Sequence, residues 1–366
     1  MTALLATLLF VQATPGAPSV RIDAVWIAIA VADGPATDAE AWAKLGQRVT
    51  GSVVIEATVA GKRALFSEAK VVVHRGKKLT PQRWPKAWEK PEVRWALLEA
   101  DPKGRLFDNT GTMERSWYPD ERKAHPASWH WCPIDVAESP LAWGKHTLTH
   151  RLDARPKRTP DTFGGLGTFR YVVELRWRGQ TVRSRGAAHR DKTGLLPGIA
   201  TVRVRRDDTP VGYMTELVNV PYVFGSSTAT KSDTDHQAER AVGADCADLV
   251  VYGWRRAAVV QRKTPPKYTY TGGLKTMTKR VAYVDTVENG VYRTGDGRPV
   301  KFGRDVEVGD LLLWKGHVAV VAERDPSGYF TPKTKILHTV IESAALVPFE
   351  KIGFGFDTMP FDVRRK

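Results

Sequence analysis

Cysteine is almost absent from this chain of 366 residues, which contains only Cys132 and Cys246. Two cysteines in a chain of this length cannot form the disulfide framework that stabilises small secreted domains. Cys132 lies between Trp131 and Pro133, and we expect a buried structural thiol there. A disulfide to Cys246 is not expected, because the sequence around Cys246 predicts a reactive thiol. The fold must therefore depend on an ordinary hydrophobic core.

The chain also lacks an apolar run long enough to span a bilayer. Residues 1–18 hold an apolar core of about ten residues, fewer than the roughly twenty that a membrane helix requires. That length, and the small residues Ala13 and Ala17 that follow, are typical of a secretory signal peptide, although the usual basic residues before the core are missing. We therefore expect an exported protein, periplasmic or extracellular, with no stable membrane span.

Acidic residues are outnumbered, with 40 Asp and Glu against 55 Lys and Arg, and the formal net charge is +15. A chain of this charge is attracted to polyanions, of which nucleic acid, an anionic cell wall and a membrane surface are examples. The basic residues are scattered, and they form neither a zinc-finger spacing, nor an RNA-binding sheet signature, nor a long basic helix. Nucleic acid is therefore not an expected partner, and most of this charge should be solvated surface.

A metal site is not expected either. His146 and His150 are four residues apart in a strand-like segment, where they would lie about 13 Å from each other. No glutamate stands beside the first histidine, as it does in the helical motif of metalloproteases. We interpret the two histidines as surface residues of a strand.

The first part of the chain is rich in predicted strands. Residues 170–178 alternate between apolar and polar side chains and end at a Gly-Gln turn. Similar runs occur at 20–31, 51–59, 63–74, 93–100, 145–152 and 201–206, whereas only 38–45 has the pattern of a short helix. Repeated short strands predict an all-β domain over 19–210, either a β-sandwich or a partly open barrel.

The segment from 101 to 137 interrupts this pattern and is rich in tryptophan, proline and charge, including Trp117 and Trp129. Exposed aromatic side chains there would stack on sugar rings. Alternatively, they fill a satellite core beneath a long loop. Further along, charge, proline and glycine cluster at 206–212, which predicts the boundary with a second domain, 211–366.

Cys246 stands where a polar loop becomes an apolar run of helical length. Apolar residues recur on one face over residues 246–260, which predicts a helix. Asp245 is suited to cap that helix, so Cys246 falls in its first turn. The backbone N–H groups and the helix dipole at this end favour a thiolate. Cys246 is therefore the candidate nucleophile.

Two histidines downstream are candidates for its partners. His317 opens the second of two apolar runs that meet at a Lys-Gly turn, and His338 lies in a third apolar run, 335–341. A cysteine at a helix start with a histidine and a polar orienting residue on neighbouring strands is the arrangement of papain-like sites. Glu342 is an alternative to His338 as the orienting residue. A final run, 353–356, is expected to add a strand to the sheet.

Five fragments carry a resemblance to a known family: Pro221-Tyr222-Val223-Phe224-Gly225, Asp245-Cys246, Gly309-Asp310-Leu311-Leu312, Gly316-His317-Val318-Ala319-Val320 and Leu337-His338-Thr339. Their order resembles the NlpC family of cell-wall cysteine peptidases, over about 215–366 and none of the first 200 residues. The resemblance implies an α+β fold class, with a papain-like domain whose cysteine helix packs on an antiparallel sheet after the β-sandwich-like domain.

The resemblance also assigns roles. It implies that Cys246 is the nucleophile, His317 the base and His338 the third polar residue, with Tyr222 at the family's tyrosine beside the nucleophile. We take Tyr222 and Asp245 as candidates for contact with the substrate or its oxyanion. The polar loop 226–235 is expected to border the cleft.

The expected reaction is hydrolysis of an amide bond through a thioester, which requires no metal and no organic cofactor. The resemblance implies a substrate in peptidoglycan, in its stem peptides or crosslinks. Two alternatives remain. One is a non-catalytic wall-binding protein with a drifted papain-like domain. The other is a cysteine amidase or acyltransferase on a non-wall substrate, which is kept open because Ala247-Asp248 replaces the family's Ser-Gly after the cysteine.

Overall fold

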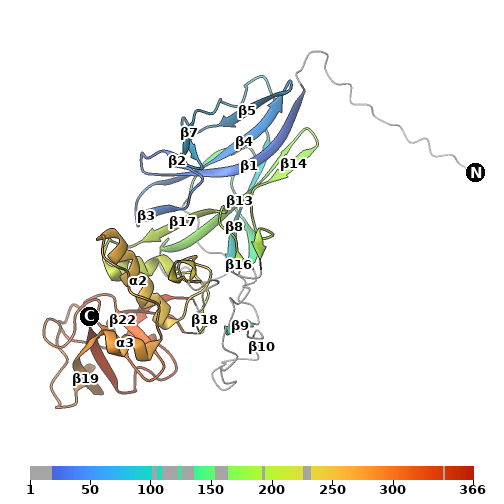
Figure 1. The fold of residues 1–366 in the computed structure, drawn as a ribbon. Coiled ribbons are helices and arrows are strands. Elements are labelled where there is room, and N and C mark those ends of the chain that lie inside the picture. Colours follow the sequence, from blue (N-terminus) through green and yellow to red (C-terminus); the bar gives the residue numbers. More distant parts are fainter. Residues whose placement is uncertain are drawn as a thin grey trace, which may run out of the picture.

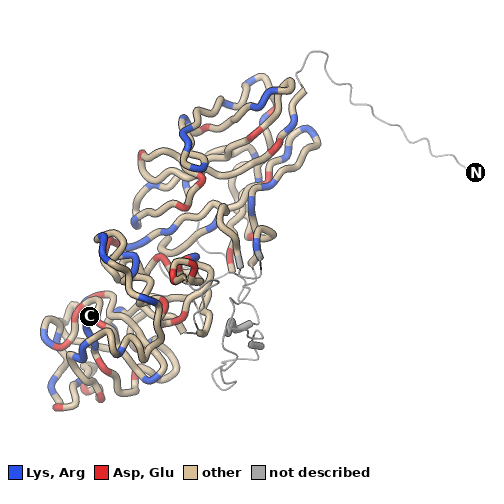
Figure 2. Tube along the Cα trace, viewed as in Figure 1, with Lys and Arg blue, Asp and Glu red and all other residues tan. Residues whose placement is uncertain are grey.

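The computed structural model describes residues 19–100, 105–108, 123–124, 136–152, 164–191, 194–225, 232–340 and 343–366. Strands make up 44% of the structure and helices 12%, with three short α-helices and curled sheets. In Figure 1 most strands up to β17 occupy one end of the molecule, and α2, α3 and the last strands occupy the other, whereas β9 pairs with β18. Lys and Arg are spread over both ends, interspersed with Asp and Glu (Figure 2).

The first sheet has seven strands in the order β12-β4-β1-β2-β6-β7, with β5 paired to β4. Its strands are β1 (Val20–Val31), β2 (Ala36–Thr37), β4 (Val49–Val59), β5 (Lys62–Ser67), β6 (Val72–His74), β7 (Lys77–Leu79) and β12 (Thr149–Arg151). The long central pair, β1 and β4, is antiparallel, and its register shifts between Ile22 and Ala24. The other strands extend the sheet from this pair: β12 and β5 pair with β4, and β2 pairs with β1.

The second sheet has six strands in the order β11-β8-β13-β17-β3, with β14 paired to β13. Its strands are β3 (Ala41–Lys44), β8 (Glu92–Ala100), β11 (Val136–Pro140), β13 (Gly167–Trp177), β14 (Gln180–Arg183) and β17 (Ala200–Arg205). The predicted short helix at 38–45 is wrong, because Ala41 and Ala43 alternate with exposed Trp42 and Lys44 in β3, which pairs parallel to β17. Sheet pairing has overridden local helix propensity there.

The first two sheets share one hydrophobic core. Side chains from β1 and β4, such as Ile27 and Ile55, pack in the same cluster as Trp95 from β8 and Leu175 from β13. Along β13, every second residue from Phe169 onward enters this core, because successive side chains of a strand point to opposite faces.

Two small sheets follow. One contains β10 (Lys123–Ala124), β9 (Arg105–Asp108) and β18 (Val223–Phe224), and the other contains β15 (Arg190–Asp191) and β16 (Gly194–Leu195). Trp117, Trp129 and Cys132, which the sequence singled out, lie outside the described residues, as does the segment 1–18.

The last sheet has seven strands in the order β20-β19-β25-β21-β22-β23-β24. Its strands are β19 (Lys279–Glu288), β20 (Val291–Thr294), β21 (Leu311–Leu313), β22 (Val318–Val321), β23 (Lys335–His338), β24 (Ala345–Pro348) and β25 (Phe361–Arg365). The helices are α1 (Pro210–Met214), α2 (Cys246–Val260) and α3 (Thr271–Met277), and short 3₁₀ turns occur at Thr215–Leu217, Asp233–Asp235 and Phe349–Lys351.

The expected fold class, α+β with a papain-like domain carrying a cysteine helix on a sheet, is wrong, because the chain is mostly β with curled sheets. The helix α2 has 15 residues, but α1 has five and α3 has seven. Residues 279–294 form the hairpin of β19 and β20, which adds two strands to the last sheet. The expected extra strand at 353–356 is also wrong, because Gly353, Phe354 and Gly355 all have positive φ angles, which strands do not use.

A buried polar network connects the second sheet to α2. Arg203 on β17 is 4% exposed and donates to the hydroxyl of Tyr252 on α2 at 2.9 Å and to Glu40 at 2.6 Å. The Tyr252 hydroxyl donates in turn to the buried carboxylate of Glu216 at 2.5 Å. Burial raises the pKa of Tyr252 and of Glu216. The network therefore fixes the helix that carries Cys246 against the N-terminal strands.

Replacing Arg203 with leucine should lower the free energy of unfolding by about 3–5 kcal/mol, because the buried hydroxyl of Tyr252 and the carboxylate of Glu40 lose their cationic hydrogen-bond donor. Urea denaturation would measure the change. The matched control is Arg94→Ala, which removes an exposed arginine with a surface ion pair to Glu92 and should cost no more than about 1 kcal/mol. Equal losses of unfolding free energy in the two variants would show that the network stabilises the fold no more than a surface ion pair does.

Candidate functional site

The predicted helix and its cap are confirmed. The Asp245 carboxylate accepts hydrogen bonds from the backbone N–H groups of Ala247 and Asp248, each at 2.9 Å. The Asp248 carboxylate accepts from the Asp245 N–H at 3.1 Å, which completes a capping box. Cys246 is the first residue of α2. Because its carboxylate is engaged in the cap, Asp245 positions the helix start.

The thiol of Cys246 is buried, with 6% of the residue exposed. Burial raises its pKa well above the ordinary value, and the negative charges of Asp245 and Asp248 add to this effect. Hydrogen bonds from the backbone N–H groups of Val318 and Ala247 to the sulfur act in the opposite direction but are outweighed. The expected thiolate is therefore not the resting form, and the group is a neutral thiol at pH 7.

Val318 is the first residue of β22 and directly follows His317. It packs in the same buried cluster as Cys246, so the strand that starts after the candidate base lies beside the candidate nucleophile. No hydrogen bond joins Cys246 to His317 within the described part of the chain. The sequence-predicted residues are thus brought to one place, with thiol and imidazole not yet paired.

His317 and His338 lie next to each other and are 2% and 6% exposed. Their ring centroids are 5.8 Å apart and the rings are nearly perpendicular, at 83°. Burial lowers the pKa of His317 to about 3, with a further contribution from His338, and burial lowers the pKa of His338 to about 4. Both rings are therefore neutral at pH 7 and able to accept a proton only when a negative charge forms beside them.

One nitrogen of each ring is buried without a partner. His317 Nε2 and His338 Nδ1 make no hydrogen bond among the described residues. Most buried polar atoms in folded proteins are hydrogen-bonded, so two unpaired nitrogens in adjacent rings require an explanation. A catalytic role is one of the explanations for such groups.

Aromatic residues that the sequence did not identify as site residues enclose His317. Phe356 stacks on its ring with centroids 4.5 Å apart, and Trp314 lies at 5.7 Å. Phe356 belongs to a segment in which Gly353 and Gly355 adopt positive φ angles. The alternation of glycine and phenylalanine over residues 353–356 was the sequence signal for this segment. It indicates a tight turn, which places Phe356 over the His317 ring.

Tyr222 lies beside the start of α2. It forms a parallel bridge to Ala244. The Val223 N–H donates to the Ala244 carbonyl, and the Ala244 N–H donates to the Pro221 carbonyl, both at 3.1 Å. Tyr222 is 6% exposed. Tyr222 therefore lies beside Ala244, which precedes Cys246 by two residues in the chain.

A third buried histidine lies under the same helix end. His236 is 2% exposed, and its Nε2 lies 3.6 Å from the Asp248 carboxylate. Its Nδ1 accepts from the Ala238 N–H at 3.2 Å, which places the ring proton on Nε2, facing Asp248. The ring stacks on Tyr268 at 3.7 Å. Burial lowers its pKa to about 3. Sequence reasoning missed His236, because it stands in a polar stretch without any periodic pattern.

Other predicted features fall outside the described residues, including Glu342 and residues 226–231 of the polar loop. Within the described ranges, no group of three or more His, Cys, Asp or Glu residues is arranged to hold a metal ion. In the same residues no helix is both long enough and apolar enough to cross a bilayer.

Comparisons with family models, with curated proteins and with solved structures found no match to this chain. The resemblance to the NlpC family therefore stays a prediction from the five sequence fragments.

Proposed function

We propose that the protein is a cysteine hydrolase that cleaves an amide bond, with Cys246 as nucleophile and His317 as base. One observation carries the proposal: Cys246, at the start of α2, packs in the same buried cluster as Val318, the residue that follows His317. The neighbouring His338 supplies a third polar group. Any likeness to the NlpC family would then lie in the chemistry of the site, since the papain-like fold is excluded.

In the proposed reaction, Cys246 attacks the amide carbonyl carbon while its thiol proton moves to His317. The resulting oxyanion accepts hydrogen bonds, for which the Cys246 N–H at the helix start and the Tyr222 hydroxyl are the candidates. The C–N bond then breaks and the amine leaves with the proton from His317. Water attacks the thioester carbonyl, His317 accepts its proton, and the carboxylic acid and the free thiol are released.

The resting state of the site indicates that substrate binding must activate Cys246 and His317. Both partners are neutral, because burial raises the pKa of the thiol and lowers the pKa of the imidazole. Substrate must bring the two groups into hydrogen-bond distance, and Phe356, which stacks on the His317 ring, must allow that approach. Proton transfer then accompanies attack on the carbonyl, and no thiolate–imidazolium pair exists beforehand.

For the substrate we propose peptidoglycan, at a bond in its stem peptides or crosslinks, and we propose that the protein is exported to meet it. The formal net charge of +15 supports an encounter with an anionic wall. Lys and Arg are spread along the described chain at both ends of the molecule (Figure 2), which is compatible with adhesion to an extended anionic polymer.

The test is incubation of the full chain with insoluble peptidoglycan, followed by mass spectrometry of the released fragments. The Cys246→Ala variant is the matched control. Fragments cut in the peptide and released only by the native protein are the expected result, and their masses identify the bond. Release by both proteins would show that Cys246 is not the nucleophile.

A second candidate function is non-catalytic binding to the wall. It is favoured by the burial of Cys246 and the missing hydrogen bond to His317, which together describe an inert structural thiol. Under this alternative, the native protein and Cys246→Ala sediment equally with peptidoglycan and neither releases fragments. If neither cleaves nor sediments, the substrate lies outside the wall.

A further inference from the structure

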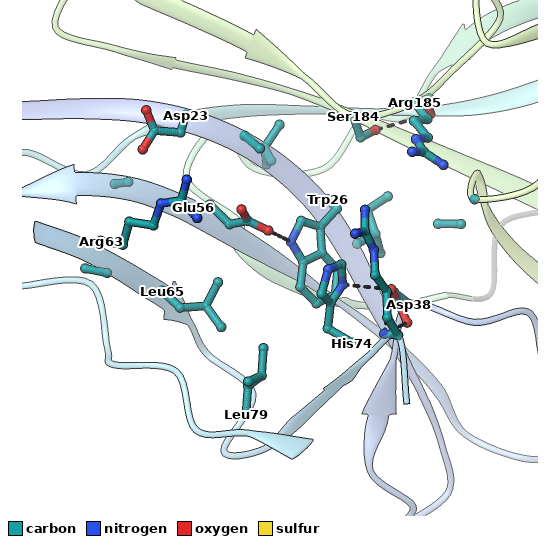
Figure 3. A pocket seen from close by; sticks show the side chains of 18 of the residues that line it. Asp23, Trp26, Asp38, Glu56, Arg63, Leu65, His74, Leu79, Ser184 and Arg185 are labelled. Atoms are coloured by element: carbon teal, nitrogen blue, oxygen red, sulfur yellow. Dashed lines mark hydrogen bonds and ion pairs between the residues drawn. The ribbon is translucent and has the colours of Figure 1, made fainter. Parts of the chain in front are cut away.

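A large open pocket lies on the outer face of the first sheet, and no residue of α2, the helix that carries Cys246, lines it. It has a volume of about 1090 Å³, at the upper end of the roughly 300–1,000 Å³ typical of small-molecule sites. Strands β1, β4 and β5 supply one wall, and residues 183–185, at the end of β14 and just after it, supply another (Figure 3). The Ile22 N–H donates to the Gln180 side chain at 2.8 Å, which holds β14 against β1.

The centre of the pocket is a pre-arranged aromatic pair. Trp26 and His74 stack with ring centroids 4.8 Å apart (Figure 3). The indole N–H of Trp26 donates to Glu56 at 3.0 Å, and His74 Nδ1 lies 2.7 Å from the Asp38 carboxylate. Asp38 is held in turn by the Arg75 N–H at 3.2 Å. The two rings are therefore fixed before any ligand arrives, which reduces the entropy lost on binding.

Polar groups on this floor are mainly acceptors. The Glu56 carboxylate uses one oxygen for the Trp26 indole, and it lines the pocket beside Thr58 and Asp23. Carboxylates accept several hydrogen bonds at once. A half-buried indole next to such acceptors suits a ring that has an apolar C–H face and hydroxyl groups around its edge, which is the character of a sugar.

Arginines around the rim lack carboxylate partners. Arg63, Arg75 and Arg185 line the pocket, and among the described residues none of their guanidinium groups forms an ion pair with a carboxylate. Arg185 donates only to the Pro197 carbonyl, at 3.3 Å. By contrast, Arg183 on the same rim is paired with Glu138 and Glu174. Three unpaired guanidinium groups around one pocket favour a ligand that carries carboxylates.

We propose that this pocket binds a short acidic saccharide, with one sugar ring packed on Trp26 and its hydroxyls bonded to Glu56. The carboxylates of the ligand pair with Arg63 and Arg75. A peptide would offer carboxylates to the arginines but few donors to the acceptors of the floor. The inference does not rest on the reaction proposed for Cys246, because none of the groups involved belongs to that site.

The test is isothermal titration of the full-length Cys246→Ala protein, in which no cleavage can occur, with tetragalacturonate and with neutral chitotetraose. Tetragalacturonate should bind at least about 10-fold more tightly than chitotetraose, and its affinity should fall as salt is raised. Trp26→Phe should weaken it by about 10-fold, and the double variant Arg63→Ala, Arg75→Ala should bring its affinity down to that of chitotetraose.

Matched controls are Trp42→Ala, an exposed tryptophan on β3, and Arg94→Ala, and both should leave the affinity unchanged. The arginine double variant alters exposed side chains only, so a loss of binding there is not a loss of folding. The proposal is overturned if tetragalacturonate does not bind, if chitotetraose binds equally well, or if inorganic phosphate displaces the saccharide as effectively as a second saccharide does. Failure of the peptidoglycan digestion would leave this result unaffected.

Discussion

Cys246→Ser and His317→Gln are expected to lower kcat/KM for amide cleavage by about 10⁴-fold or more and by about 10²–10⁴-fold, respectively. Serine keeps the size of the side chain but is far less acidic than a thiol, and the weak base beside it cannot compensate. Glutamine preserves hydrogen bonding at position 317 but cannot shuttle a proton. The measurement is the initial rate of fragment release under conditions where substrate is far below saturation.

His338→Gln belongs to the same experiment and should cost about 10-fold, because His338 contacts the base and not the reacting atoms. It is a positioning residue, and its ring lies edge-on to that of His317. The control is His150→Gln, a half-buried histidine stacked on Trp143 far from the site in sequence and sheet, which should retain the native rate. If His317→Gln cleaves at the native rate, the assignment of the base is wrong.

The start of α2 was predictable from sequence because its determinants are local. An aspartate before a helical apolar pattern, with a second acidic residue three positions later, specifies a capping box wherever it occurs. The same holds for the strand that follows His317 and the strand that ends at His338, because each is an apolar run that can be recognised in the sequence. These features fixed the approximate place of the candidate site.

The class of the fold was not predictable in this way, because it depends on which strands pair with which. Residues 38–45 illustrate this point. Their sequence has a helix pattern, but residues 41–44 form β3, which pairs with β17. The enclosure of His317 by Phe356 depends on a turn nearly 40 residues downstream. His236 reaches Asp248 only because a polar stretch folds back under α2. None of these contacts leaves a periodic signal in the chain.

The electrostatic state of the site was also mispredicted from sequence. The helix start favours a thiolate by a modest amount, typically less than about 1 kcal/mol at a helix terminus. Desolvation at a residue with 6% exposure, with Asp245 and Asp248 adjacent, acts more strongly in the opposite direction. Burial is a property of the folded chain, so its effect on the pKa could not be weighed beforehand.

Acid should unfold this protein steeply, because three histidines are buried in the neutral form. The pKa values of His236 and His317 are lowered to about 3 and that of His338 to about 4, against about 6.5 in an unfolded chain. Below pH 6.5 the unfolded state therefore binds protons at these three histidines, whereas the folded state does not. Their contribution to stability is fully present above pH 6.5 and is lost as pH falls toward the folded values.

The expected size is about 1.4 kcal/mol per pH unit for each histidine, or about 4 kcal/mol for the three between pH 7.5 and 5.5. That is a large share of the 5–15 kcal/mol of a typical domain. Glu216 acts in the opposite sense, because burial raises its pKa and acid relieves the cost of its charge. One such carboxyl offsets only part of the loss from three imidazoles.

Urea denaturation at pH 7.5, 6.5 and 5.5 would measure this dependence, and its slope gives the number of protons taken up on unfolding. His236→Phe keeps a ring for stacking on Tyr268 and should reduce the slope by about one proton. A stability that varies by less than about 1 kcal/mol over this range would mean that the three rings are protonated in the folded state. His317 would then be charged at mildly acidic pH and unable to act as the base, so the same titration bears on the mechanism as well as on the fold.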